Sequence, residues 1–134
     1  RLLAKVFTAD RTSMEDKLRA MRDHPPPDPA GVPGHSAIAW PRELLYDERR
    51  RLIGFLMPYV RDAVPALDVL NPRRRALTLP GFDRAYLHRA ARNLASALAA
   101  LHDAKVVVGD LNERNVLVPP RALVTSIVAR PRPR

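Results

Sequence analysis

Residues 106–118 constrain the fold of this chain more than any other segment. They read VVVGDLNERNVLV, so that Asp110 and Asn115 stand five residues apart in a polar turn. Apolar runs rich in β-branched residues flank the turn, and such runs favour buried strands. The segment therefore predicts two short strands joined by a loop that carries a carboxylate and a carboxamide. A plain Asp/Asn turn between two strands would account for the same residues.

A long amphipathic helix is expected just before this segment. Between Asp83 and Asp103 the sequence is rich in Ala and Leu and contains neither Pro nor Gly. Apolar residues recur there at spacings of three and four, the one-sided stripe of a helix that packs on a core. They are Leu87, Ala91, Leu94, Leu98 and Leu101. The helix leads into the turn that holds Asp110.

The first sixty residues predict a strand, a helix and a hairpin. Residues 2–7 are an apolar run of the kind found in buried strands, with Lys5 inside it, and residues 13–21 read as a short helix. A Lys in an edge strand is also a common protection against aggregation. Residues 43–57 predict a β-hairpin, because an apolar run, a charged turn and a second apolar run follow one another.

In their order, these segments resemble the parts of a protein kinase domain. The match runs from residue 2 to residue 118 and includes strand, helix, hairpin, hinge, long helix and Asp loop. Residues 70–75, 79–83 and 109–115 are similar to bacterial kinase-like proteins that often carry a helix-hairpin-helix DNA-binding region. The resemblance implies an α+β architecture, an incomplete kinase-like fold with a partial N-lobe sheet and the first part of a helical C-lobe.

The resemblance also implies roles for individual residues. Asp110 corresponds to the base that accepts the proton of the substrate hydroxyl, and Asn115 to a ligand of the Mg²⁺ that is bound with ATP. Lys5 and Glu15 correspond to the ion pair that steadies the ATP phosphates. Asp16 replaces Glu15 if the helix register differs by one residue.

The hinge of the kinase fold corresponds to the residues that follow the second strand of the hairpin. Met57 takes the place of the gatekeeper residue. Tyr59 and Val60 belong to the hinge itself, where backbone groups normally bind adenine. The resemblance therefore implies ATP as a ligand and a protein Ser or Thr hydroxyl as the phosphate acceptor, without identifying the substrate protein.

The chain departs from the kinase pattern beside the Asp. The usual His-Arg before it is replaced by Val108 and Gly109, and the usual Lys two residues after it by Asn112. The first change argues against control by activation-loop phosphorylation, and the second removes a positive charge near the transferred phosphoryl group. The bacterial subfamily tolerates Gly-Asp-x-Asn, so these replacements do not by themselves indicate an inactive homologue.

Both ends of the chain depart from the family as well. No Gly-rich loop precedes Lys5, and after a strand expected over residues 122–128 an Arg-Pro run stands in place of a second Mg²⁺-binding Asp. Such a run is typical of GC-rich DNA translated in a wrong frame. We expect a truncated kinase domain, divided into N-lobe and hinge (1–60), start of the C-lobe (61–128) and a disordered tail (129–134). Alone it would have little or no activity.

The composition supports an alternative function and excludes several others. The net charge is +9, so the alternative is a non-enzymatic basic module that binds nucleic acid or protein, through Arg73, Arg74 and Arg75 among others. Aromatic residues are only 5%, which allows at most weak, nonspecific nucleic-acid binding. Without Cys, disulfides and thiolate zinc sites are excluded. No apolar run reaches the roughly 18 residues of a membrane span, so we expect a cytoplasmic protein.

Overall fold

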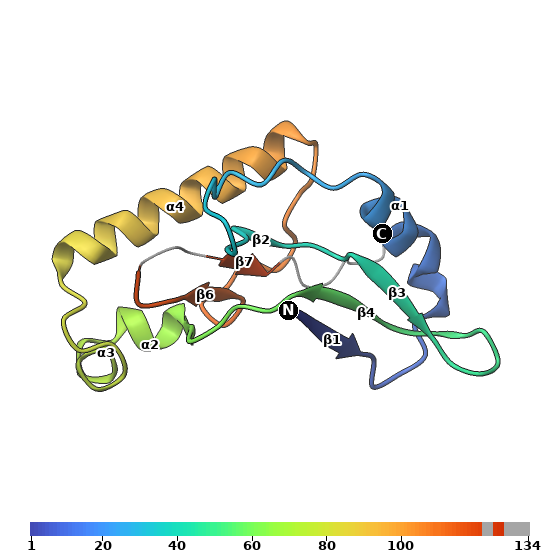
Figure 1. Cartoon of the computed structure of the whole chain (residues 1–134), viewed down its shortest axis with the longest axis horizontal. Coiled ribbons are helices and arrows are strands. Elements are labelled where there is room, and N and C mark those ends of the chain that lie inside the picture. Colours follow the sequence, from blue (N-terminus) through green and yellow to red (C-terminus); the bar gives the residue numbers. More distant parts are fainter. Residues whose placement is uncertain (122–124, 128–134) are drawn as a thin grey trace.

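Two small sheets and one long helix dominate the structure (Figure 1). The computed structural model describes residues 1–121 and 125–127. The strands are β1 (Leu2–Val6), β2 (Ile38–Ala39), β3 (Glu43–Tyr46), β4 (Leu52–Pro58), β5 (Val64–Pro65), β6 (Val116–Val118) and β7 (Thr125–Ile127). The helices are α1 (Glu15–Asp23), preceded by a 3₁₀ turn, α2 (Ala66–Leu70), α3 (Pro72–Thr78) and α4 (Arg84–Asp103). The expected α+β composition is confirmed.

The first sheet contains three antiparallel strands in the order β1-β4-β3. Strands β3 and β4 form the hairpin expected over residues 43–57. Strand β1 pairs along the other edge of β4, with Lys5 opposite Phe55. At Gly54 a Cβ atom would lie 2.2 Å from the Lys5 carbonyl oxygen. The absence of a side chain at residue 54 therefore sets how closely β1 can approach β4.

The second sheet joins segments that lie far apart in the sequence. Its order is β2-β7-β6-β5, with β2 parallel to β7 and the other pairs antiparallel. Helix α4 runs alongside this sheet in Figure 1. The strand expected over residues 122–128 is present as β7 in its central part. Its remaining residues and the tail over 129–134 lie outside the described residues.

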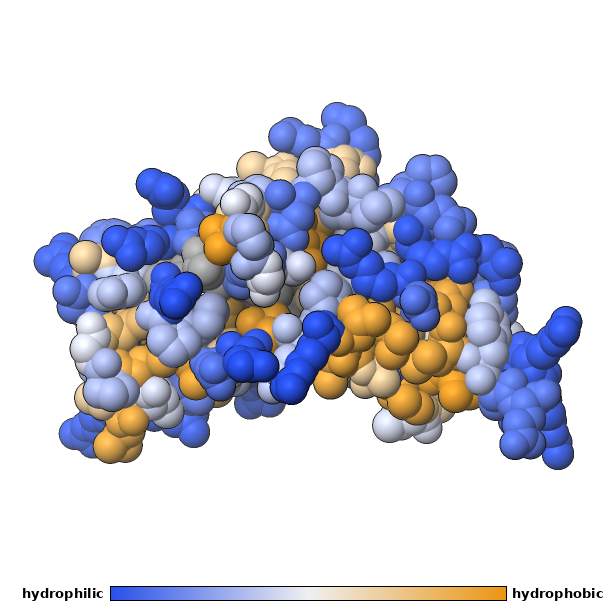
Figure 2. Space-filling model, viewed as in Figure 1, coloured by the Kyte–Doolittle hydropathy of each residue, from blue (hydrophilic) through white to orange (hydrophobic). Residues whose placement is uncertain are grey.

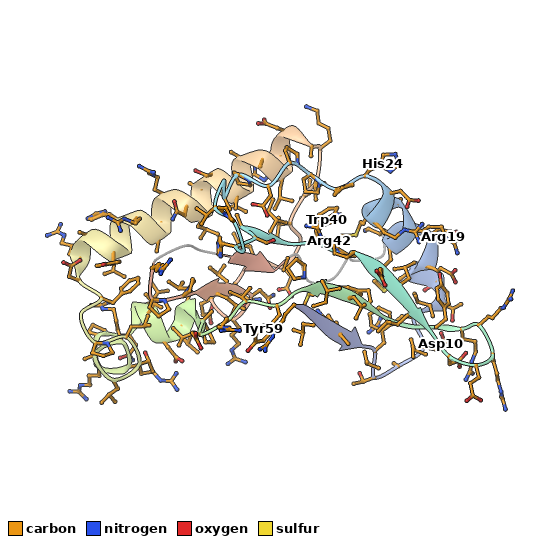
Figure 3. All side chains as sticks on the ribbon, viewed as in Figure 1. Asp10, Arg19, His24, Trp40, Arg42 and Tyr59 are labelled. Atoms are coloured by element: carbon orange, nitrogen blue, oxygen red, sulfur yellow. The ribbon has the colours of Figure 1, made fainter. Side chains whose placement is uncertain are left out.

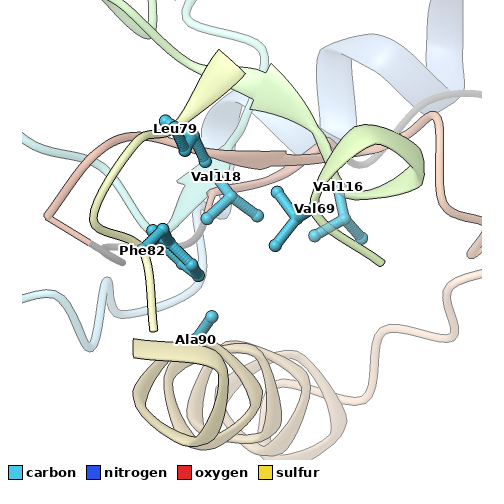
Figure 4. Packing of buried hydrophobic residues seen from close by; sticks show 6 residues of the cluster. All are labelled: Val69, Leu79, Phe82, Ala90, Val116 and Val118. Atoms are coloured by element: carbon cyan, nitrogen blue, oxygen red, sulfur yellow. The ribbon is translucent and has the colours of Figure 1, made fainter. Parts of the chain in front are cut away.

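Three apolar clusters hold the elements together. The first joins α2, the connection between α3 and α4, and α4 itself to β6 (Figure 4), through Val69, Leu79, Phe82, Ala90, Val116 and Val118. The second packs β2 on the last part of α4, through Ala37, Ile38, Trp40, Ala97 and Leu101. The third packs α1 on the first sheet, through Leu18, Ala39, Leu52, Phe55 and Met57.

Two expectations about the apolar runs were wrong. Residues 106–108 form no strand; they follow a left-handed turn at Lys105, where φ is 60°, and Val106 and Val108 pack against the second cluster. The side chains of Val106 and Val108 are thus partly buried, although their backbone is not part of a strand. Strand β1 is not buried either, because Leu2 and Val6 are 51% and 60% exposed. Figure 2 shows apolar surface over the first sheet, on the right of the view.

The bounds of the long helix agree closely with their prediction, but Ala91 of the expected stripe is exposed, and the buried alanines are Ala90 and Ala97. Helix α4 covers residues 84–103, and the Asp83 side chain caps its first turn by accepting a hydrogen bond from the Tyr86 backbone N–H at 3.1 Å. Leu101 is fully buried. Its carbonyl oxygen accepts a hydrogen bond from the Val106 backbone N–H at 2.8 Å. The end of α4 is therefore fixed to the segment that leads to Asp110.

Candidate functional site

The loop between α4 and β6 brings Asp110 and Asn115 into contact. The Asn115 Nδ2 group donates a hydrogen bond to the Asp110 carbonyl oxygen at 2.9 Å. The same nitrogen lies 3.3 Å from the Asp110 carboxylate Oδ2. Both side chains are partly buried. A carboxylate and a carboxamide are thus held together on one short loop, while the roles implied for them stay predictions.

Asn112 organises this loop from within. Its Oδ1 accepts hydrogen bonds from the backbone N–H groups of Arg114 at 2.9 Å and Asn115 at 3.2 Å. Its Nδ2 donates to the Asp110 carboxylate Oδ1 at 3.0 Å. Sequence reasoning treated Asn112 only as the loss of a Lys. An Asn in a turn, however, often accepts a hydrogen bond from a backbone N–H group about two residues further along the chain. That preference could have identified Asn112.

The elements around the loop fix it at both ends. Val116 and Val118, which follow directly, are 4% and 2% exposed and belong to the first apolar cluster. In the middle of the loop, the Glu113 carbonyl oxygen accepts a hydrogen bond from the Leu67 backbone N–H at 3.0 Å. The loop that carries Asp110 is therefore fixed to the core at its C-terminal end and to α2 in its middle.

Lys5 lies on the face of the first sheet that α1 covers. Side chains alternate along a strand, and the cross-strand partners of Leu3 and Lys5 are Met57 and Phe55, which pack in the third cluster with Leu18 of α1. The Lys5 ammonium is 5.9 Å from the centre of the Phe55 ring. This placement suits a Lys that meets an acidic residue of α1.

The carboxylate of Glu15 is engaged with two other residues. Arg19 Nη2 lies 2.5 Å from Glu15 Oε1, and the Tyr46 hydroxyl donates to the same oxygen at 2.9 Å. The hydrogen bond from Arg19 lowers the pKa of Glu15 below its usual value of 4.5. Partial burial, with the bond to Glu15, raises the pKa of Tyr46. The Lys5–Glu15 pair stays a prediction, and the exposed Asp16 stays its alternative.

The hinge residues line a cavity of about 770 Å³. This hinge cavity is bordered by Pro58, Tyr59 and Val60, with Leu2, Arg42, Arg61 and Pro119 among its other walls. Figure 3 shows Tyr59 where β4 continues toward α2. The Tyr59 backbone N–H donates to the Arg1 carbonyl oxygen at 3.2 Å. Met57, by contrast, is buried in the third cluster and faces away from solvent.

The donor set near Asp110 suits Mg²⁺ better than a metal with a full set of protein ligands. Within the described ranges, no three His, Cys, Asp or Glu side chains gather as a metal site. Mg²⁺ commonly takes one or two protein oxygens and completes its shell with water and phosphate oxygens. The carboxamide oxygen of Asn115 is of this type, and its role as a Mg²⁺ ligand stays a prediction.

The basic run at the start of α3 is largely engaged within the protein. The Arg74 Nη1 group forms an ion pair with Asp68 at 2.8 Å. The Arg75 Nη1 group donates to the Val69 carbonyl oxygen at 2.8 Å. Two of the three consecutive arginines thus contact their own chain, which weakens the case for a nucleic-acid surface here.

In the described part of the chain, no helix has the length and apolarity to cross a bilayer.

Comparison with known proteins supports a kinase-like relationship. No protein-family model matches the chain. Two curated proteins from Escherichia coli, strains O157:H7 and K12, both described as protein kinase YegI, are each 35% identical to the chain over 82 residues. The aligned segment covers 60% of this chain and 13% of each relative. The chain therefore spans only a small part of the relatives that it matches, and its α+β architecture is consistent with a partial kinase-like fold.

Proposed function

We propose that this chain carries nucleotide- and Mg²⁺-binding residues of a protein kinase domain. The reaction would be transfer of the γ-phosphoryl group of ATP to a protein Ser or Thr hydroxyl. One observation carries the proposal: Asn112 and Asn115 both hold Asp110 through side-chain hydrogen bonds, at 3.0 Å to Oδ1 and at 2.9 Å to the carbonyl oxygen. The 35% identity to a protein kinase supports it independently.

The chemistry follows from the nature of phosphoryl transfer. Its transition state is loose and charge-rich, so the protein mainly positions groups and stabilises charge. Asp110 would orient the acceptor hydroxyl and take its proton. A carboxamide oxygen of Asn115 would be a ligand of Mg²⁺, which neutralises phosphate charge when it is bound. Lys5 would contact the phosphates from the sheet face that α1 covers.

The hinge cavity is the proposed adenine site. It lies where β4 ends, beside Tyr59 and Val60, and Leu2 supplies an apolar wall. Binding sites for small molecules are concave, mostly apolar and edged by a few polar backbone groups. With about 770 Å³ the cavity falls within the usual size range of such sites.

Calorimetric titration of the chain with a non-hydrolysable ATP analogue, with and without Mg²⁺, tests the binding part. We expect Mg²⁺-dependent binding that Asn115→Ala weakens and that Asp103→Asn leaves unchanged. Asp103 is the matched control, because it is an exposed acid seven residues before Asp110. Absence of Mg²⁺-dependent binding in the unaltered chain would overturn the proposal.

Transfer of labelled phosphate to a generic protein substrate tests the catalytic part. Removal of a general base typically costs about 10²- to 10⁴-fold in rate, so Asp110→Asn should abolish whatever transfer occurs while analogue binding persists. Measurable transfer by the unaltered chain would also show that the 134 residues need no further segment for activity. Transfer that continues undiminished in Asp110→Asn would remove Asp110 from the reaction.

A further inference from the structure

A second cavity lies between α4 and the connection from α1 to β2. It has a volume of about 570 Å³, and its walls are the α1–β2 connection and the face of α4 that carries residues 88–96. In Figure 1 that connection passes alongside α4 before it turns into β2. Pro29, Val32 and His35 line it from the connection, and His88, Arg89 and Arg92 are among the α4 residues that face them. We call it the α4 cavity.

The polar wall of the α4 cavity is cationic. Arg89 and Arg92 are three residues apart, so their side chains neighbour each other on the helix surface. No Asp or Glu belongs to the described residues that line the cavity. Like charges at this spacing repel each other, and an anion placed between them would relieve the repulsion. His35 and His88 add ring nitrogens, each of which can donate a hydrogen bond.

The opposite wall is a shaped loop whose one acidic residue is already engaged. The Asp28 carboxylate accepts hydrogen bonds from the backbone N–H groups of Ala30 at 2.9 Å and Ala37 at 3.0 Å. These bonds close the connection over residues 28–37 and use the negative charge of Asp28 to hold the loop. The loop then presents apolar surface from Pro29 and Val32 to the arginines.

One of the two arginines is oriented in advance. The Arg89 guanidinium stacks over the Tyr86 ring, 5.2 Å from its centre. Stacking on an aromatic ring restricts an Arg side chain, and a guanidinium group can bind phosphate through two parallel N–H groups. The Ser96 hydroxyl donates to the Arg92 carbonyl oxygen at 3.1 Å. Arg89 and Arg92 share the helix wall with the polar side chains of His88 and Asn93.

We propose that the α4 cavity binds a phosphate monoester whose organic part lies against Pro29 and Val32. Two guanidinium groups suit a dianion, and no Asp or Glu among the described lining residues competes for them. The cavity volume exceeds what phosphate alone would fill. Either a phosphorylated side chain of a peptide or a small phosphorylated molecule offers this chemistry. The proposal does not require the kinase function, because neither arginine belongs to the loop or the hinge; of the residues named here, His35 also lines the hinge cavity.

Titration of the nucleotide-free chain with three probes tests the site. The probes are a short peptide with one phosphoserine, the same peptide unphosphorylated, and inorganic phosphate. We expect the phosphopeptide to bind, and Arg89→Gln or Arg92→Gln to weaken binding roughly tenfold each, as the loss of a charge-assisted hydrogen bond implies. Arg84→Gln is the matched control, because Arg84 is exposed on the same helix and does not line the cavity.

Each outcome decides the matter. Phosphopeptide binding that depends on Arg89 and Arg92 but not on Arg84 supports a site for a phosphorylated side chain. Inorganic phosphate that binds as well, with the same dependence, supports the site and assigns it to small phosphorylated molecules. Equal losses in all three variants, equal binding of both peptides, or no binding would overturn the proposal and leave only attraction by the net charge of +9.

Discussion

The loop around Asp110 and the sheet face around Lys5 are built in different ways. The loop is closed by side chains that lie two to five residues from the groups they bind. The environment of Lys5 is assembled from β1, β4 and α1, and Glu15 meets Tyr46 across 31 positions of sequence. A locally closed loop keeps its form as long as its two ends are fixed. The sheet face exists only while three distant segments remain packed.

The largest effect is expected where the loop meets the core. Leu101 is 0% exposed, and its backbone carbonyl holds Val106. We expect Leu101→Ala to lower the free energy of unfolding by about 3 kcal/mol, the usual cost of a cavity at a buried Leu. Urea denaturation followed by circular dichroism measures the loss. Leu77→Ala is the control, since Leu77 is 84% exposed; equal losses in both variants would contradict the assigned core.

A change at Gly54 should damage the sheet face and spare the loop. The new Cβ would lie 2.2 Å from the Lys5 carbonyl oxygen, so β1 must move. We expect Gly54→Ala to cost about 2 kcal/mol, a typical penalty for crowding in a packed region. Amide hydrogen exchange should then quicken in β1 and remain slow in β6.

The rates of amide hydrogen exchange in β1 and β6 show whether the loop depends on the sheet face. If protection in β6 fell as much as in β1, the loop would depend on the sheet and the comparison would fail. Ala4→Val is a control for added volume in the neighbouring strand β1, because Ala4 is exposed. It should alter neither strand.

Two substitutions of Asn112 separate the effect of its acceptor oxygen from that of its donor nitrogen. Asn112→Ala removes all of its side-chain bonds and should cost about 1 kcal/mol, the typical net value of a hydrogen bond. Asn112→Asp retains an acceptor for the N–H groups of Arg114 and Asn115 but places a second carboxylate beside Asp110. Backbone amide chemical shifts of Asn115 should therefore change in the Ala variant more than in the Asp variant. Identical spectra for both would show that the cap does not position the loop.

The same division between local and distant contacts explains how much the sequence could predict. Helix α4 was predictable because its stripe and its Asp83 cap lie within one segment. The hairpin was predictable for a similar reason. Strands β2 and β5 have two residues each and depend on partners many positions away, so no periodicity marks them. Residues 106–108 carry strand-forming side chains, but burial against α4 took precedence over pairing.

The candidate site follows the same rule. Asp110 and Asn115 were found from their spacing, because one loop contains both. Of the two partners of Glu15, Arg19 lies four residues along the same helix and could have been found from that spacing. Tyr46 belongs to the hairpin and could not. Glu15 was assigned by its likeness to a family pattern, and nothing in that pattern identifies a competing Tyr. Long-range partners of a charged side chain come from packing, which the spacing of residues does not specify.

The smallest expected effect is a dependence of the sheet face on pH. The pKa of Glu15 is lowered by its bond to Arg19, so this contact stabilises the fold above pH 4.5 and is lost as the pH falls through the lowered value. The pKa of Tyr46 is raised by partial burial and by Glu15, so its contribution is lost as the pH rises above 10.0. Glu15 is half-buried and Tyr46 is 39% exposed, so water still screens the contact and the effect stays small.

Thermal unfolding of the unaltered chain and of Glu15→Gln across this pH range measures the Glu15 contribution. The midpoint of the unaltered chain should be higher near neutral pH and should meet that of Glu15→Gln in acid. Asp10 and Asp47 also have lowered pKa values, through bonds to Thr12 and Arg51, and they destabilise both chains alike in acid. The difference between the two chains therefore reports Glu15 alone. A difference that persisted unchanged below pH 3 would mean that the ionised carboxylate contributes nothing to holding α1 against β3.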